Sequence, residues 1–230
     1  MKLTIKKIAT LAMLAAMAYV VMVFIRIPIM PAAPYLEYDA KDIFFVMAGF
    51  LVGPVEGIIV VVLVCLIEMV TVSTAGPIGL LMNVIASLCF VVPATFLYKR
   101  KKSTLTAVVG LSLGVITMTG SMILWNYLIT PLYTGTPREA IVLMLPTVFL
   151  PFNLIKAGIN MALTLIIYSP IALVVRKSGL LEDNSAKKEI KEGEKKPAVA
   201  FSPIPIVIGL VLLSVCAGVI LLIKAAGAPA

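Results

Sequence analysis

The sequence contains no histidine, only three cysteines and few charged residues, which make up 13% of its 230 positions. Without histidine there is no imidazole for general acid–base catalysis or for a histidine-containing zinc site. Cys65, Cys89 and Cys216 are widely spaced, and each lies in an apolar stretch. They indicate small buried apolar residues rather than disulfides or metal ligands, so no metal site is predicted.

The motifs of nucleotide-using enzymes are also missing. The sequence has no glycine-rich loop that ends in Lys-Ser or Lys-Thr, and no closely spaced pair of aspartates inside an apolar stretch. Glu37, Asp39 and Asp42 of "EYDAKD" fall in a connection between apolar runs, where a solvated loop is the simplest interpretation. We therefore expect no catalytic residues and no cofactor. If ATP drives a process here, the ATPase is on another chain.

What the sequence does have is long apolar runs. Apolar residues make up 61% of the chain, and several windows of about 20 residues, the length that crosses a bilayer, are almost free of charge. This predicts an all-α polytopic membrane bundle. The expected helices are 5–27, 41–52, 55–73, 77–98, 104–130 and 142–176, followed by a separate span at 204–224. The second is short, and "GFLVGP" predicts a tight hairpin between it and the third.

The basic residues predict the orientation of the chain. If the N-terminus is cytoplasmic, 14 of the 19 Lys and Arg residues lie inside, and Lys156 alone is within the membrane. The other four lie outside: Arg26, Lys41, Arg138 and Lys224. The net charge of +8 then reflects a basic inner rim that faces anionic lipid, and no nucleic acid partner is needed. We expect three parts: a six-helix membrane domain at 1–177, a charged cytoplasmic linker at 178–202 and an additional transmembrane helix at 203–230.

A few polar side chains fall inside the predicted spans, where each is costly unless it faces protein, water or a ligand. They are Glu68, Asn83, Asn126, Asn153, Lys156 and Asn160. Asn153, Lys156 and Asn160 follow a spacing of i, i+3 and i+7, so they share one helix face. Two interpretations stay open. The aligned groups bind a ligand, or the amides join helices while Lys156 pairs with Glu68.

The connection "RIPIMPAAPYLEYDAKD" is unusual because Pro28, Pro31 and Pro34 prevent a helix and stiffen the segment. Such a loop could lie over a cavity or be a plain exposed connection.

Four segments together carry a family resemblance: "LEYDAKDIFFVMAGFLVGPVEG", "TAGPIGLLMNVIASLCFVVPATFLYKRKK", "WNYLITPLY" and "LPFNLIKAGIN". In this order, over residues 5–176, the chain resembles the riboflavin-specific substrate-binding (S) components of energy-coupling factor (ECF) vitamin transporters. The resemblance implies six helices, a riboflavin pocket near the outer face and a first loop that caps it. It also implies a prokaryotic cell membrane, a transmembrane coupling subunit (EcfT) and two cytoplasmic ATPase subunits as partners.

The same resemblance suggests site residues. Family members bind the vitamin at positions that match Asn126, Asn153 and Lys156, and the match makes Tyr38 and Asp39 candidates in the first loop. We add Asn83 of the fourth helix to this set. Amides suit the alternating donors and acceptors on the edge of the riboflavin ring, and Lys156 adds donors. The lysine is then tolerated because the vitamin, or water in its absence, is its partner.

The first helix carries a strip of small residues, Ala9, Ala12 and Ala16. Such a strip allows close approach of another helix, and in S components it resembles the docking surface for the coupling subunit. The alternative is packing within this chain, which is also what we expect of Gly110 and Gly114 in "GLSLG". The last span lies beyond the resemblance. Two other functions stay open: an S component for another vitamin, and a membrane scaffold without a ligand.

Overall fold

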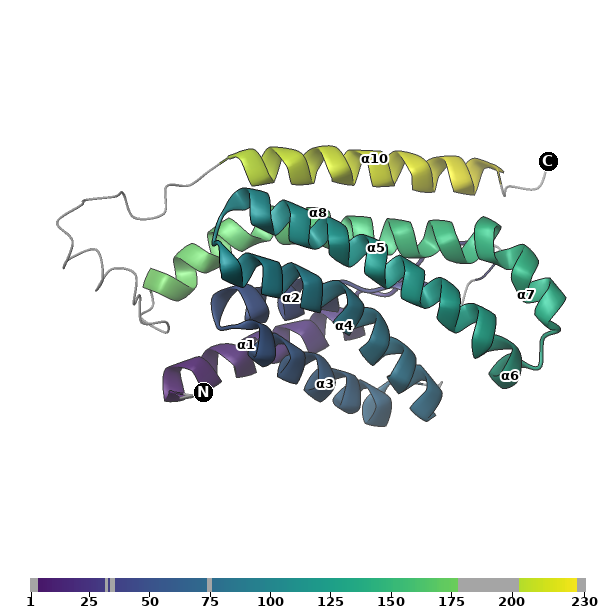
Figure 1. Cartoon of the computed structure of the whole chain (residues 1–230), viewed down its shortest axis with the longest axis horizontal. Coiled ribbons are helices and arrows are strands. Elements are labelled where there is room, and N and C mark those ends of the chain that lie inside the picture. The colour runs from purple at the N-terminus through teal and green to yellow at the C-terminus, as the bar shows by residue number, and fades with distance from the viewer. Residues whose placement is uncertain (1–3, 32, 34–35, 74–75, 178–202, 227–230) are drawn as a thin grey trace.

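The computed structural model describes residues 4–31, 33, 36–73, 76–177 and 203–226, and the chain forms a helical bundle (Figure 1). This confirms the predicted all-α membrane fold. The helices are α1 (Ile5–Phe24), α2 (Lys41–Leu51), α3 (Pro54–Thr71), α4 (Gly76–Arg100), α5 (Thr104–Leu128), α6 (Thr130–Thr134), α7 (Arg138–Met144), the π-helix η1 (Leu145–Phe149), α8 (Leu150–Lys177) and α10 (Ile204–Ala226). Two short strands, β1 (Ile27–Pro28) and β2 (Glu37–Tyr38), precede α2.

Six helical segments of the described chain are long and apolar enough to cross a membrane: α1, α3, α4, α5, the continuous stretch from α7 to α8, and α10. Helix α2 is different. Its 11 residues reach only about 16 Å at 1.5 Å per residue, roughly half of the hydrocarbon core. Every residue from Lys41 to Phe50 is buried, so α2 is the central element around which the longer helices pack.

The predicted hairpin between α2 and α3 is confirmed. Only Val52 and Gly53 separate the two helices, and Pro54 begins α3, where its missing N–H costs nothing. The helices also pack closely, because a Cβ added to Gly57 would lie 3.1 Å from the Cα of Gly49. The hairpin therefore holds α2 inside the bundle.

The helix predicted at 5–27 ends at Phe24, and Ile27 and Pro28 form β1 instead. Two further predicted boundaries differ from the structure at prolines. The helix expected at 104–130 ends at Leu128, and a separate short helix, α6, follows with Pro131 in its first turn. The helix expected to begin at 142 begins at Arg138 and passes through the π-helix η1, which contains Pro146. In both places a proline removes a backbone donor, so the regular hydrogen-bond ladder cannot continue.

The predicted internal seam at Gly110 and Gly114 is confirmed between α5 and α4. A Cβ on Gly110 would lie 2.9 Å from the carbonyl oxygen of Ala94, and a Cβ on Gly114 would lie 2.5 Å from that of Phe90. Both distances are too short for real atoms, so only glycine permits this helix approach.

The first loop (residues 25–40) joins α1 to α2, and several of its described residues pack against the bundle. Its two strands pair antiparallel, with Ile27 opposite Tyr38 and Pro28 opposite Glu37. Ile29, Met30 and Ala33 are buried. The alternative of a plain exposed connection is therefore wrong.

Helix α10 lies along α8, on the side of the bundle opposite α1 and α3 (Figure 1). A Cβ on Gly209 would lie 2.6 Å from the carbonyl oxygen of Ala162, and a Cβ on Gly158 would lie 3.1 Å from Cys216 Sγ. The predicted linker at 178–202 falls outside the described residues.

Candidate binding site

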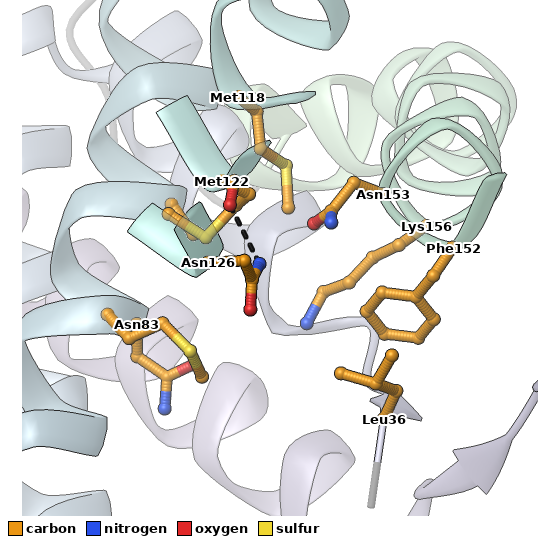
Figure 2. A pocket seen from close by; sticks show the side chains of 10 residues that line it. Leu36, Asn83, Met118, Met122, Asn126, Phe152, Asn153 and Lys156 are labelled. Carbon is orange, nitrogen blue, oxygen red and sulfur yellow. Dashed lines mark hydrogen bonds between the residues drawn. The ribbon is translucent and has the colours of Figure 1, made fainter. Parts of the chain in front are cut away.

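A small cavity lies between α4, α5, α8 and the first loop, with a volume of about 50 Å³. Its apolar wall comes from Leu36 of the first loop, the α5 residues Met118 and Met122, and Phe152 of α8, as Figure 2 shows. Its polar groups are those of Asn83, Asn126, Asn153 and Lys156. The structure thus brings four of the six predicted binding residues to one place, and they come from three helices.

The two central amides are held in place by the backbone. Asn126 Nδ2 donates to the carbonyl oxygen of Met122 at 2.7 Å, and Asn126 Oδ1 accepts from the hydroxyl of Thr130 at 2.9 Å. Asn153 Nδ2 donates to the carbonyl oxygen of Phe149 at 2.8 Å. That carbonyl belongs to the last residue of η1, so the π-helix takes part in orienting Asn153. Each amide keeps a second N–H and a free lone pair for another partner.

Lys156 has a protein partner, which corrects the expectation that only a ligand or water would satisfy it. Its Nζ lies 2.8 Å from Asp39 Oδ2. The alternative pairing with Glu68 is also wrong, because Glu68 Oε2 pairs with Lys41 Nζ at 2.6 Å. Asp39 therefore connects the first loop to the cavity lysine on α8.

The acidic segment "EYDAKD", which runs into the first turn of α2, is largely buried, and this corrects its assignment to a solvated loop. Asp39 is 8% exposed, and Asp42 and Lys41 are each 1% exposed. Only Glu37 stays at the surface, 3.7 Å from Arg26. The reason is that α2 is central, so its first turn lies inside the bundle. Lys41, counted among the outer cations, is thus a second buried lysine beside Lys156.

Sequence reasoning missed Lys41, Asp42 and Ser87 as members of the site, although one signal was available. The run "IFFVMAGF" that follows Asp42 is apolar on all helix faces, which is typical of a helix that is buried all round. The charged first turn of such a helix is buried with it.

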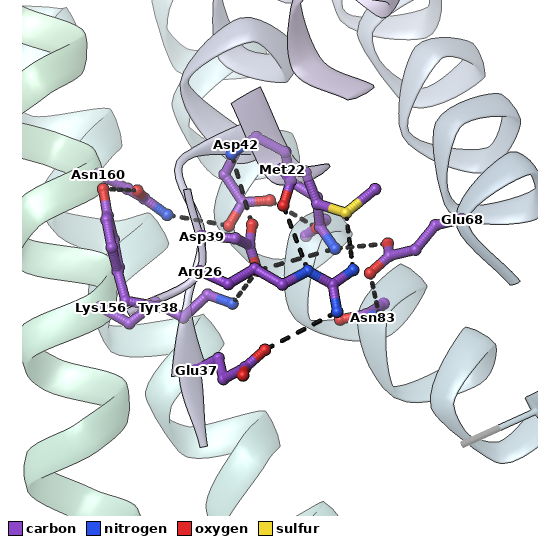
Figure 3. A network of polar contacts seen from close by, with 12 residues as sticks. Met22, Arg26, Glu37, Tyr38, Asp39, Asp42, Glu68, Asn83, Lys156 and Asn160 are labelled. Atoms are coloured by element: carbon purple, nitrogen blue, oxygen red, sulfur yellow. Dashed lines mark hydrogen bonds and ion pairs between the residues drawn. The ribbon is translucent and has the colours of Figure 1, made fainter. Parts of the chain in front are cut away.

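Figure 3 shows how these groups form one network around the end of the first loop. Ser87 Oγ donates to Asp42 Oδ1 at 2.6 Å, and Asn160 Nδ2 donates to Asp42 Oδ2 at 3.0 Å. Tyr38 donates its hydroxyl proton to Asn160 Oδ1 at 3.0 Å. Asn83 Nδ2 donates to Glu68 Oε1 at 3.3 Å. Tyr38 and Asp39 do not line the cavity themselves. They fasten the first loop beside it.

Asp39 and Tyr38 lie in the first loop, and their protonation states follow from their surroundings. Burial alone would raise the pKa of Asp39, but the charges of Lys156 and Lys41 outweigh it and lower the pKa to about 2. Burial, followed by the charge of Asp39, raises the pKa of Tyr38 well above its usual value. Asp39 is therefore ionised and Tyr38 is neutral at physiological pH, so the ion pair and the tyrosine hydrogen bond persist together.

The small residues of α1 lie on the outside of the bundle. Ala9, Ala12 and Ala16 are exposed, whereas Leu14 and Ala18 face the core. The alternative of packing within this chain is therefore wrong for the strip in the structure.

These features can be compared with known proteins. The model of the family "ECF transporter, substrate-specific component" matches residues 6–168. The chain belongs to this family. It is accordingly the substrate-binding component of a prokaryotic membrane transporter, with the apolar helices that such a protein needs.

This S component has named relatives. It is 31% identical to the "Riboflavin transporter RibU" of Staphylococcus aureus (strain TCH60) over 75% of this chain and 93% of the relative. It is 33% identical to the "Riboflavin transporter FmnP" of Bacillus subtilis (strain 168) over 66% of this chain and 84% of the relative.

A solved structure, described as "Structure and mechanism of the S component of a bacterial ECF transporter", matches with a TM-score of 0.62 and 33% identity. The match covers 74% of this chain and 97% of the other. The family model ends at residue 168, so α10 of this S component lies beyond it.

Proposed function

We propose that this S component binds riboflavin in the cavity, at the extracellular side, and passes it to ATP-driven partner subunits. One observation carries the proposal. The amides of Asn126 and Asn153 and the ammonium group of Lys156 meet from two helices at one apolar-walled cavity (Figure 2). The names of the two relatives, both riboflavin transporters, support the same ligand.

The chemistry of the lining suits this vitamin. Riboflavin has a flat tricyclic ring with alternating donors and acceptors along one edge and hydroxyl groups on its ribityl chain. The free N–H and lone pair of each amide can pair with the ring edge. Lys156 offers charge-assisted hydrogen bonds to a ring carbonyl or to the hydroxyls. Met118, Met122 and Phe152 supply polarisable and aromatic surface for the ring.

The cavity has to enlarge before the vitamin enters. Its volume of about 50 Å³ is well below the roughly 300 to 1,000 Å³ of small-molecule sites. Leu36 of the first loop forms part of the wall, and Asp39 and Tyr38 fasten the loop to α8. Movement of the first loop would both widen the cavity and release Lys156 from Asp39. In this mechanism the vitamin replaces the carboxylate as a partner of the lysine.

Delivery needs partners, and we propose the coupling subunit and two cytoplasmic ATPases implied by the family resemblance. The exposed strip of Ala9, Ala12 and Ala16 on α1 is the docking surface in this proposal, because small side chains let a second helix approach closely. The N-terminus and the linker at 178–202 are then cytoplasmic. The S component itself supplies binding, not catalysis.

A spectrum of the purified protein tests the ligand. We expect protein from cells grown with riboflavin to be yellow and to show a flavin absorption spectrum, and calorimetry on ligand-depleted protein to show saturable riboflavin binding. The same calorimetry is repeated with a panel of other vitamins. Tight binding of one of these in place of riboflavin would overturn riboflavin as the ligand but would leave the assignment as an S component unchanged. Failure to bind any vitamin would favour a scaffold role.

A further inference from the structure

A second hollow lies on the outer surface of the bundle, away from the cavity, between α4 and α5. It is a groove of about 360 Å³ lined by Leu88, Cys89, Val92, Pro93 and Thr117. Its volume is within the range of small-molecule sites, unlike that of the cavity. The groove faces the surroundings of the bundle, which in a membrane are lipid or another membrane protein.

The groove is apolar because its one hydroxyl is already engaged. Pro93 has no N–H, so the carbonyl oxygen of Cys89, four residues earlier, lacks its helical donor. Thr117 Oγ1 donates to that carbonyl oxygen at 2.5 Å. The same hydroxyl lies 2.8 Å from the carbonyl oxygen of Leu113 on its own helix, so it is engaged within the helix seam. The groove offers no free donor or acceptor for a polar ligand.

One end of the groove leads to a cluster of positive charge. Lys99, Arg100, Lys101 and Lys102 are all exposed at the junction of α4 and α5. Arg100 follows Cys89 by 11 residues, close to three full turns, so both lie on the same face of α4. The chain has no Asp or Glu between Glu68 and Glu139. Within the described part of the chain, none of these four cations forms a salt bridge.

The distance between groove and cluster fits a lipid. From Val92 to Arg100 the helix rises about 12 Å, and from Cys89 about 16 Å, while half of the hydrocarbon core is about 15 Å. The surface between them is also apolar, since Phe96, Val109 and Leu113 are exposed there. A chain that begins at the cations thus stays on apolar surface until it reaches the groove.

We propose that the groove and the cationic cluster together form a binding site for one anionic phospholipid. The phosphate lies at Lys99 to Lys102, where each nearby cation contributes about 1 kcal/mol of attraction. One acyl chain runs past Phe96 into the groove at Val92 and Pro93. The charge selects the headgroup, and the groove retains the chain. A helix of a partner subunit or of a second copy would fill the groove, but it would not account for the cationic cluster.

Native mass spectrometry of the full chain, released from detergent with added lipids, tests the site. We expect one phosphatidylglycerol to be retained at least about fivefold more than phosphatidylcholine, a factor equivalent to about 1 kcal/mol. Two variants test separately how the headgroup contacts and the groove contribute to lipid retention. Neutralising the cluster (K99Q, R100Q, K101Q and K102Q together) should abolish the preference. Val92→Phe should fill the groove and reduce retention of both lipids.

Two matched controls test whether removing cations elsewhere, or enlarging another exposed side chain, has the same effect. Lys6→Gln with Lys7→Gln removes cations from the start of α1, and Ile116→Phe enlarges an exposed side chain beside Thr117. Both should leave the retained lipid unchanged, with thermal unfolding showing that every variant is folded. Equal retention of the two lipids by the unaltered chain would overturn the proposal. Unchanged lipid retention in Val92→Phe would also overturn the proposal. This conclusion holds whether or not the variant loses its association with partner subunits or with another copy of the chain.

Discussion

Lys156 both lines the cavity and forms half of an ion pair. Its Nζ lies 2.8 Å from Asp39 Oδ2. In the proposed function, a substitution of this lysine therefore changes two things at once: contacts to the vitamin, and the compensation of a buried carboxylate. Experiments that measure only affinity would confuse these effects, so stability has to be measured as well.

The first prediction separates them. Lys156→Ala and Lys156→Met should each weaken riboflavin binding by about 1 to 3 kcal/mol, because a charge-assisted hydrogen bond is lost. Both should also lower the unfolding temperature, since Asp39 then keeps only Lys41, at 3.8 Å. In the double variant K156M with D39N the unfolding temperature should recover while the affinity stays low. Calorimetry and thermal unfolding measure the two quantities.

Recovery of both quantities in the double variant would contradict the binding role and make Lys156 structural. Unchanged affinity in the two single variants would do the same.

Sequence reasoning located the polar residues of the cavity, but neither its apolar wall nor the buried ion pairs of Asp39 and Glu68. Asn126, Asn153 and Lys156 are rare polar groups in apolar spans, so their cost in a membrane makes them visible. Lys41 and Asp42 were missed, because their burial depends on α2 packing at the centre of the bundle. That arrangement is set by contacts between distant helices, and the only local signal of it is the apolar run "IFFVMAGF" that follows the two charged residues.

At the element scale, α1 has a buried face and an exposed face. Leu14 and Ala18 pack against the core, and Ala12 and Ala16 are exposed. This arrangement predicts that binding and delivery can be changed independently.

The second prediction uses that independence. Replacing Ala12 and Ala16 together with Leu should abolish riboflavin uptake by cells, because the added bulk blocks close approach of a partner helix. The affinity of the purified chain should change by less than about tenfold, or 1.4 kcal/mol. Met17→Phe, which enlarges another exposed side chain of α1, is the control and should leave uptake intact. Normal uptake in the double variant would exclude the strip as the docking surface.

The third prediction concerns the seam between α4 and α5. Gly114→Ala should destabilise the chain by about 1 to 3 kcal/mol, because the new Cβ would collide with the Phe90 carbonyl and push the helices apart. Gly120→Ala on the same helix is the matched control, since a Cβ there meets nothing within 4 Å. Thermal unfolding in detergent compares them. Equal unfolding temperatures would mean that the seam relaxes without cost.

Structural features were predictable where they follow from a short, local sequence pattern. The hairpin after α2 and the glycine seam follow from short motifs, and both are confirmed. The π-helix η1 was not predicted, because Pro146 is compatible with either an interrupted or a continuous helix. Which of the two forms depends on the tertiary contacts of Val148 and Phe149, which are buried in the bundle.

At the scale of the whole molecule, the cavity and α10 lie on different sides of α8. The cavity residues Phe152, Asn153 and Lys156 face the bundle, whereas Gly158 and Ala162 contact α10. The matched family region also ends at residue 168, before α10 begins. The resemblance correctly indicated the core, and it could not say where an element outside the family would pack.

The fourth prediction follows. A chain that ends at Lys177 should bind riboflavin within about tenfold of the full chain, because none of the described residues beyond Lys156 lines the cavity. Gly209→Leu in the full chain is a milder test of the same contact, since its side chain would meet the Ala162 carbonyl. Calorimetry on folded, monodisperse protein is the measurement. A larger loss in both variants would show that α10 holds α8 in its binding position.

The small volume of the cavity has a kinetic consequence. If widening must precede entry, the observed association rate is limited by loop opening and levels off at high vitamin concentration, and the closed population lowers the apparent affinity. Stopped-flow quenching of flavin fluorescence should show this plateau. Tyr38→Phe, which removes the hydrogen bond to Asn160, should raise the plateau, because the loop then opens more often. A rate that rises linearly over the same range would mean that loop opening does not limit association.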